Sequence, residues 1–364
     1  MNRYLLLTPG PLTTSEKVRQ QMLEDRCTWD DEYKQLTQAI RRELLAIAEV
    51  DEEDYTTVLM QGSGSFVVES VLTSTIRPTD KVLIITNGAY GERLAQMAQR
   101  IGLSYVQYAT PYDEYPEMQK VEDYLIKDAS ITHIAIVHCE TTTGILNPID
   151  KVSALATRYG KTFIVDAMSS FGGVPIAVGE LGIDFLISSA NKCIQGVPGF
   201  GFVLAKKTAL QKCEGVARSL SLDLYDQWKV MDVDGKWRYT SPTHVVAAFL
   251  QAIEELKEEG GVQARFQRYT ENNQILRDRL AKVGFKGYID GDKQSPIITA
   301  FLYPNEQFQF NHFYEEMKAQ GFVLYPGKLT EVNTFRIGNI GEIYKEDIEK
   351  LCTLIENYMA VTVK

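Results

Sequence analysis

The chain has 364 residues, of which 45% are hydrophobic and 24% charged, and its formal net charge is −10 at pH 7. This length allows a large core, and we expect two domains. The acidic balance argues against nucleic acid or an anionic membrane surface as a partner.

At its start the chain carries three consecutive leucines, Leu5 to Leu7, directly before Thr8-Pro9-Gly10-Pro11. This run is too short for a secretory signal, and no apolar run approaches the roughly 20 residues that span a bilayer. We therefore expect a mature, soluble chain with no membrane partner. The five cysteines form no C-x-x-C pair and the four histidines show no ligand spacing, so we expect reduced thiols, a cytoplasmic location and no metal.

From about residue 55 to residue 205, short apolar runs alternate with helical patterns. Several runs are apolar throughout, for example residues 134–137, which suits strands buried on both faces. Helical patterns lie between them at residues 67–76, 92–101 and 151–159. This alternation predicts an α/β fold with a mainly parallel, seven-stranded sheet covered by helices. The predicted strands are residues 55–60, 82–86, 104–108, 132–138, 162–166, 184–188 and 200–205.

The pattern changes after Ser241-Pro242, where two long helical stretches follow one another. We predict a smaller C-terminal α+β domain and place the division between residues 1–245 and 246–364. The first 15 or so residues are expected to form an arm near the site. The elements predicted here are helices at 243–259, 264–283, 308–320 and 345–358, and strands at 296–303, 322–325 and 334–337.

Open parallel sheets bind ligands at the carboxyl ends of their strands. After the first predicted strand lies Gly62-Ser63-Gly64-Ser65, followed by a helix. Small residues, free helix amides and two hydroxyls suit a phosphate there. A strand-to-helix turn capped by serine is the alternative. Position 67 is Val67 instead of a third glycine, and no Gly-Lys-Ser/Thr follows, so neither the dinucleotide fingerprint nor the P-loop is present.

Polar groups also follow three later strands. Thr142 lies in a hydroxyl-rich loop that suits either a ligand or a plain polar turn. Asp166 ends the fifth predicted strand, where it can pair with a protonated pyridine nitrogen or cap a helix. Lys192 follows the sixth strand among small residues, where it can form a Schiff base with an aldehyde cofactor, although a solvated lysine is the alternative. Together the phosphate loop, carboxylate and lysine predict pyridoxal 5′-phosphate.

At this point the sequence resembles the class V group of the fold-type I aminotransferases. The resemblance extends over nearly the whole chain. The segments that carry it are Leu7-Thr8-Pro9-Gly10-Pro11, Cys27-Thr28-Trp29-Asp30, Gln61-Gly62-Ser63-Gly64-Ser65, Asn87-Gly88-Ala89-Tyr90-Gly91-Glu92, His138-Cys139-Glu140-Thr141-Thr142-Thr143-Gly144, Ser188-Ser189-Ala190-Asn191-Lys192-Cys193 and Phe335-Arg336-Ile337-Gly338.

The resemblance implies a role for each matching residue. Lys192 would carry the cofactor and move the proton, and Asp166 would pair with its ring nitrogen. Arg336 would bind the carboxylate or phosphonate of the substrate, because a planar guanidinium meets oxyanions through two hydrogen bonds. The remaining residues would contact the cofactor: Ser63, Gly64 and Ser65 its phosphate, Thr142 its phenolic oxygen, Tyr90 and Met168 its ring, and Thr243 the phosphate of the neighbouring subunit in a homodimer with shared sites.

Overall likeness within the group favours members that move the amino group of 2-aminoethylphosphonate to pyruvate, giving phosphonoacetaldehyde and alanine. The alternative in the same group uses alanine or serine as donor and glyoxylate or pyruvate as acceptor. A rival of another class is an α/β protein whose Gly62–Ser65 turn holds a different phosphate. Whether Arg336 alone neutralises a phosphonate, or acts with Arg3 or Lys328, stays open at this level.

Overall fold

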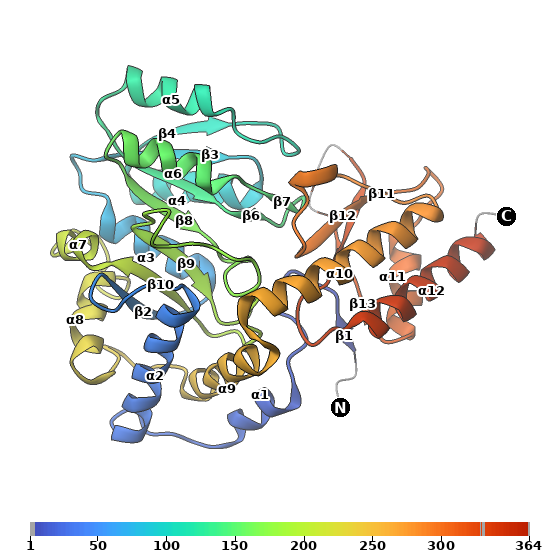
Figure 1. Ribbon diagram of the computed structural model, residues 1–364, viewed down its shortest axis with the longest axis horizontal. Helices are drawn as coiled ribbons and strands as arrows, with labels where there is room; N and C mark the ends of the chain where they lie inside the picture. Colours follow the sequence, from blue (N-terminus) through green and yellow to red (C-terminus); the bar gives the residue numbers. More distant parts are fainter. Residues whose placement is uncertain (1–3, 328, 330–331, 363–364) are drawn as a thin grey trace.

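A seven-stranded sheet forms the centre of the larger part of the molecule in the computed structural model, which describes residues 4–327, 329 and 332–362 (Figure 1). Its strands are β2 (Tyr55–Gln61), β3 (Lys81–Thr86), β4 (Ser104–Ala109), β5 (Ile131–Val137), β8 (Thr162–Asp166), β9 (Phe185–Ser189) and β10 (Phe200–Lys206). They lie in the order β2-β10-β9-β8-β5-β3-β4, and β10 alone is antiparallel to its neighbours. The predicted mainly parallel α/β sheet is confirmed.

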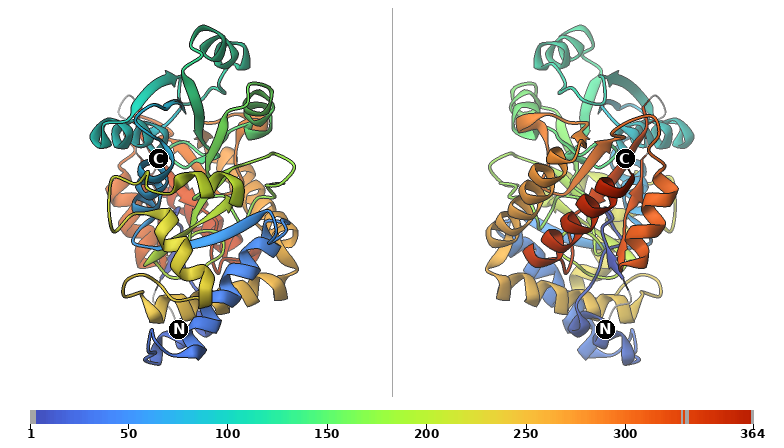
Figure 2. Two further views of the ribbon diagram at one scale, coloured as in Figure 1. Left: turned by 90° about the vertical axis from the view of Figure 1, so that its left-hand side faces the viewer. Right: turned by 90° about the vertical axis from the view of Figure 1, so that its right-hand side faces the viewer.

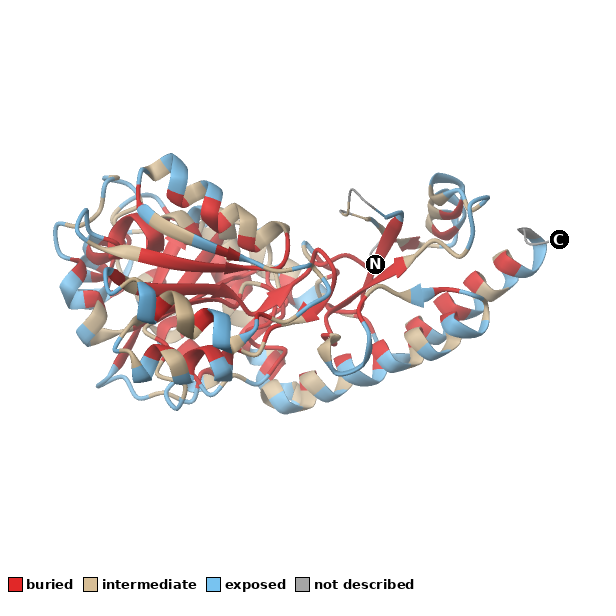
Figure 3. Ribbon diagram, turned by 90° about the horizontal axis from the view of Figure 1, so that it is seen from above, coloured by how far each residue is buried: buried red, intermediate tan, exposed pale blue. Residues whose placement is uncertain are grey.

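Helices cover both faces of this sheet. In β3, Val82 and Ile84 pack into one apolar cluster and Leu83 and Ile85 into the other, because successive side chains of a strand point to opposite faces. Buried strands between exposed helix surfaces are visible in Figure 3. One cluster contains residues of α2 (Asp31–Ile47), α5 (Met118–Lys127), α6 (Ile149–Arg158) and α9 (Thr243–Glu259); the other contains residues of α3 (Gly64–Thr75), α4 (Ala89–Ile101) and α8 (Leu224–Asp234).

The C-terminal part has a four-stranded antiparallel sheet and a core of its own, as expected for an α+β unit. Its centre is a group of aromatic rings that includes Phe285, Phe301 and Phe335. Two of its helices, α10 (Gly261–Lys282) and α12 (Lys345–Thr362), lie side by side (Figure 2). The other elements are β11 (Lys286–Gly287), β12 (Ile298–Leu302), β14 (Tyr325–Pro326), β15 (Thr334–Gly338) and α11 (Phe310–Ala319).

The N-terminal segment joins the two parts. Strand β1 (Leu5–Leu6) pairs with β13 (Phe322–Val323) of the C-terminal part. Leu7 then accepts a hydrogen bond from the Gly338 amide at 3.0 Å, and Pro9 accepts one from Lys192, which follows β9 of the large sheet. The remaining elements are α1 (Glu16–Gln20), α7 (Lys207–Leu210), three 3-10 turns (Gln21–Leu23, Gln211–Cys213 and Gly291–Lys293) and the hairpin of β6 (Cys139–Glu140) and β7 (Ile145–Leu146).

Helix α9 bears on the domain boundary. Its apolar residues, among them Val246, Phe249 and Ile253, lie in the core of the large sheet. The helix ends at Gly260, whose φ of 106° is the left-handed conformation that glycine adopts most easily. Helix α9 therefore packs with the large sheet, and the division at residue 245 stays a prediction. Within the described ranges, no helix combines the length and apolarity needed to cross a membrane.

Candidate active site

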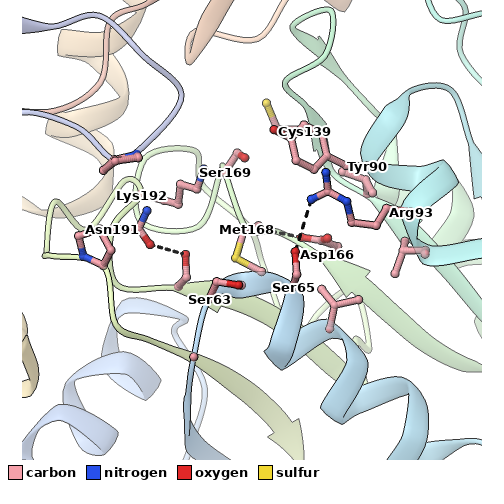
Figure 4. A pocket seen from close by; sticks show the side chains of 18 of the residues that line it. Ser63, Ser65, Tyr90, Arg93, Cys139, Asp166, Met168, Ser169, Asn191 and Lys192 are labelled. Carbon is pink, nitrogen blue, oxygen red and sulfur yellow. Dashed lines mark hydrogen bonds between the residues drawn. The ribbon is translucent and has the colours of Figure 1, made fainter. Parts of the chain in front are cut away.

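A cavity of about 570 Å³ lies at the carboxyl ends of β2, β8 and β9 (Figure 4). Seven of the predicted site residues line it, although they come from four separate stretches of the chain. Thr142, Thr243 and Arg336 are outside its lining. The seven residues are Ser63, Gly64, Ser65, Tyr90, Asp166, Met168 and Lys192.

The turn from β2 into α3 forms one wall of the cavity. Gly62 has a φ of 109°, and Ser63 stands in extended backbone immediately before the helix without capping it through its side chain. The first amides of a helix have no intrahelical acceptor. At Gly64 a Cβ atom would lie 2.4 Å from Sδ of Met168, so the absence of a side chain keeps this wall open. The turn therefore presents hydroxyls and helix amides to the cavity, which suits an anion.

Asp166 is the last residue of β8 and is 7% exposed. Its carboxylate accepts a hydrogen bond from the Met168 amide at 2.9 Å and makes no ion pair within 4.0 Å among the described residues. Burial raises its pKa to about 6; the hydrogen bond from Met168 and the charges of Lys192 and Arg93 oppose that rise. A buried carboxylate at the end of a strand with no cationic partner suits a ligand that brings a positive charge.

Lys192 follows β9 and is held from above by the N-terminal segment. Its Nζ donates a hydrogen bond to the carbonyl oxygen of Pro9 at 2.8 Å. A Cβ atom on Gly10 would lie 2.7 Å from Cδ of Lys192, so glycine allows the segment to lie this close. Burial lowers the pKa of the lysine, and the neighbouring Tyr90, Cys193 and Asp166 oppose this only in part. The pKa shift favours the neutral amine, which is the nucleophilic form.

Glu140 holds the first turn of α4 and with it Tyr90. Its carboxylate, which is wholly buried, accepts hydrogen bonds from the amides of Tyr90 and Gly91 at 3.1 and 3.0 Å and from the hydroxyl of Thr142 at 2.8 Å. Burial raises its pKa and these hydrogen bonds lower it. On Gly88 a Cβ atom would lie 2.1 Å from Cγ of Glu140, so only glycine fits there. This network explains where Thr142 lies, because its hydroxyl also accepts a hydrogen bond from the Ala89 amide at 3.1 Å.

Arg336 lies in β15 and is 3% exposed. It donates hydrogen bonds to the carbonyl oxygens of Pro326 and Thr141, each at 3.0 Å, and has a side-chain hydrogen bond with Tyr90. Burial lowers its pKa. No carboxylate of the described residues lies within ion-pair distance of it, so it is a buried cation with no counter-ion.

Three expectations concern residues away from the cavity. Thr243 begins α9 and stays a prediction for a neighbouring subunit's site. Arg3 and Lys328, the other candidate cations, lie outside the described residues. Sequence reasoning missed two residues: Arg93, which lies one helical turn after Tyr90 and lines the cavity, and Glu140, which supports the wall through Tyr90 and whose signal was its position three residues after the buried strand β5.

Comparisons with known proteins show the family and the fold of the chain. The chain is 65% identical over 361 residues to a 2-aminoethylphosphonate–pyruvate transaminase of Lysinibacillus sphaericus strain C3-41, and 58% identical over 361 residues to one of Bacillus cytotoxicus, with 99% of both chains covered each time. In fold it is similar to an alanine–glyoxylate aminotransferase of Nostoc sp., at a TM-score of 0.90 and 24% identity, with 98% of this chain and 95% of that chain covered. Residues 26–320 match the family described as Aminotransferase class-V, and the chain belongs to this family.

Proposed function

We propose that the chain is a pyridoxal-phosphate-dependent transaminase that moves the amino group of 2-aminoethylphosphonate to pyruvate. The observation that carries this proposal is the 65% identity, over 99% of both chains, to a relative named for that reaction. The geometry supports it independently, because the cavity holds a half-buried lysine and a buried carboxylate, with a buried arginine adjoining it, and none of the three has an ionic partner among the described residues.

The residues fit the cofactor by their chemistry. Asp166 would face the ring nitrogen, Lys192 would bond to the aldehyde carbon, and the Ser63–Ser65 turn would hold the phosphate. When bound, pyridoxal 5′-phosphate supplies an aldehyde that takes up the amine and a ring that withdraws electrons from the neighbouring carbon. The carboxylate of Asp166, which is costly to bury without a partner, would then be paired with the protonated ring nitrogen.

The chain's own groups supply the rest of the chemistry. Nζ of Lys192, with its lowered pKa, would move the proton from the amine-bearing carbon of the donor to the former aldehyde carbon of the cofactor in the first half of the reaction. In the second half it would move a proton in the opposite direction, onto the carbon of the acceptor. Met168 and Tyr90 border the cavity on either side of Asp166 and would restrict the ring to one plane. The N-terminal segment lies against Lys192 and would restrict the access of water to that amine.

Arg336 would bind the anionic end of each substrate, the phosphonate of the donor and the carboxylate of pyruvate. Its guanidinium is fixed by two backbone carbonyls and by the Tyr90 hydroxyl, so it needs little reorganisation to meet an oxyanion. One cation serving both substrates suits a reaction in which donor and acceptor occupy the same site in turn.

A homodimer with shared sites and a cytoplasmic location are part of this proposal. Thr243 lies outside the cavity of its own chain, which is compatible with a role in the site of a second copy. Phe66, which follows the phosphate turn, is 55% exposed and would be covered in such a pair. The cysteines of the described residues are free thiols, which fits a reducing compartment.

The test is the visible absorption spectrum of the purified chain with pyridoxal 5′-phosphate. We expect a yellow protein that bleaches with 2-aminoethylphosphonate alone and recovers its colour with pyruvate, and a Lys192→Ala variant that does neither. If the band ignores this donor but bleaches with alanine or serine, the substrate assignment is wrong and the cofactor assignment stands. If no band forms with added cofactor, both are wrong.

A further inference from the structure

Arg93 is a cation in the wall of the cavity to which neither the sequence motifs nor the proposed reaction gives a role. It lies in α4, one turn after Tyr90, and Figure 4 shows its guanidinium beside Asp166 and Ser65. Its Nη1 donates a hydrogen bond to Oγ of Ser65 at 3.4 Å. The centre of its guanidinium lies 5.0 Å from the centroid of the Tyr90 ring. The side chain is half-buried and lines the cavity.

The charge of Arg93 is not neutralised by the protein. Within the described part of the chain, no carboxylate lies within 4.0 Å of it, and its side chain donates one hydrogen bond, to Ser65. Asp166 is close enough for the arginine to lower its pKa without forming an ion pair. A guanidinium that faces a cavity in this way, with most of its five donors unused, suits an anionic ligand.

Two anionic groups would enter this site under the proposed function, the cofactor phosphate and the acidic end of the substrate. The contacts of Arg93 lie on the phosphate side, since Ser65 belongs to the first turn of α3, whose amides and hydroxyls form the anion-binding turn. Arg336, by contrast, lies in strand β15 and forms its hydrogen bond with the phenolic hydroxyl of Tyr90. The two arginines therefore approach Tyr90 from different directions.

We propose that Arg93 is a ligand of the cofactor phosphate and that it completes, with Ser63 and Ser65, the charge of the phosphate site. This inference rests on the proposed cofactor. A dianionic phosphate held by helix amides and serine hydroxyls alone would meet only neutral donors, and Arg93 supplies the positive charge. As a second consequence, the charge of Arg93 favours the ionised form of Asp166, which the cofactor ring requires.

The experiment compares the binding of pyridoxal 5′-phosphate and of pyridoxal, which lacks the phosphate, to the full-length chain freed of cofactor. Both aldehydes react with Lys192 and give a visible band, so the difference between their dissociation constants isolates the phosphate. We expect Arg93→Gln to raise the dissociation constant of pyridoxal 5′-phosphate about tenfold to a hundredfold, which is typical of a lost hydrogen bond to a charged group. The dissociation constant of pyridoxal should stay unchanged. Arg93→Lys should retain most of the affinity because it retains the charge.

Arg100→Gln is the matched control, because it removes a positive charge from an exposed position two turns further along the same helix. It should change neither dissociation constant. If Arg93→Gln raises the dissociation constants of both aldehydes equally, Arg93 acts through Tyr90 or the fold and the proposal is wrong. If it leaves both unchanged and raises the KM for the phosphonate donor, Arg93 binds the substrate and the proposal is again wrong. A wild-type chain that binds neither aldehyde refutes the cofactor assignment instead.

Discussion

The burial of Asp166 without a cationic partner has a measurable cost for the protein without cofactor. Its pKa in the folded chain is about 6, compared with an ordinary value of 3.8, and the leading cause is burial. At about 1.4 kcal/mol per pKa unit, this difference corresponds to about 3 kcal/mol. We therefore predict that Asp166→Asn makes the cofactor-free chain more stable at neutral pH, while weakening its affinity for pyridoxal 5′-phosphate.

The sign of this stability change follows from the number of protons that the folded and unfolded chains bind. Between about pH 4 and about pH 6 the folded chain keeps the proton on Asp166 while the unfolded chain loses it, so the free energy of unfolding falls as pH rises through this window. Below the window the carboxyl is neutral in both states and asparagine gives no advantage. Between about pH 4.5 and about pH 7.5, the advantage of Asp166→Asn should grow by about 2 kcal/mol. Asparagine can still accept the hydrogen bond from the Met168 amide, so the packing is retained.

The assay is urea unfolding of wild type and variant at both pH values, at one protein concentration, with the difference between the two chains taken at each pH. The difference cancels the titration of all other groups. Asp113→Asn, which removes an exposed carboxylate, is the control and should show no such growth. A stability difference between wild type and Asp166→Asn that is the same at both pH values would refute the reasoning, whatever its size.

Three further predictions concern Lys192, Tyr90 and Glu140. The rate at which the cofactor-free chain takes up pyridoxal 5′-phosphate should rise with pH with an apparent pKa below 10.5, because burial lowers the pKa of Lys192 and only the neutral amine attacks; a midpoint at or above that value would contradict this. Tyr90→Phe keeps the ring but loses the hydroxyl that contacts Arg336, so the KM for the donor should rise about tenfold with the cofactor dissociation constant unchanged, and an equal change in both would count against it. Glu140→Gln should lower the free energy of unfolding by about 1–3 kcal/mol, measured by urea at neutral pH, because an amide NH2 group would face the donors of the first turn of α4; an unchanged midpoint would disprove the role.

Most of the sheet could be predicted from the sequence because its strands other than the edge strand β4 are largely buried on both faces. Such strands are continuous apolar runs, so their ends are sharp: residues 132–138 were predicted where the structure has Ile131–Val137. The direction of β10 could not be predicted, because hydrophobic patterns carry no information on whether a strand runs parallel or antiparallel to its neighbour. The same limitation applies to its position between β2 and β9.

The site was predictable where one residue type at one strand end implies a chemistry, as for Asp166 and Lys192. It was not predictable where the role depends on a distant contact. The carbonyl of Pro9 that holds Lys192 is 183 residues away in the chain. Arg93 could not be distinguished from other helix charges, since the face that α4 turns toward the cavity is set by Glu140, which accepts hydrogen bonds from its first turn.

Asp166, Lys192 and Arg336 have one property in common that explains why the site can be both stable and reactive. Asp166 and Arg336 are buried and Lys192 is half-buried; each is held by backbone groups, and none forms an ion pair within the described part of the chain. Direct pairing of Lys192 with Asp166 would relieve the cost of burial but would raise the pKa of the lysine and remove the charge that the cofactor ring needs. Separation of the charges by the fold therefore leaves each one available to a ligand: under the proposed function, the cofactor would pair with the carboxylate, and the bound substrate would pair with the arginine.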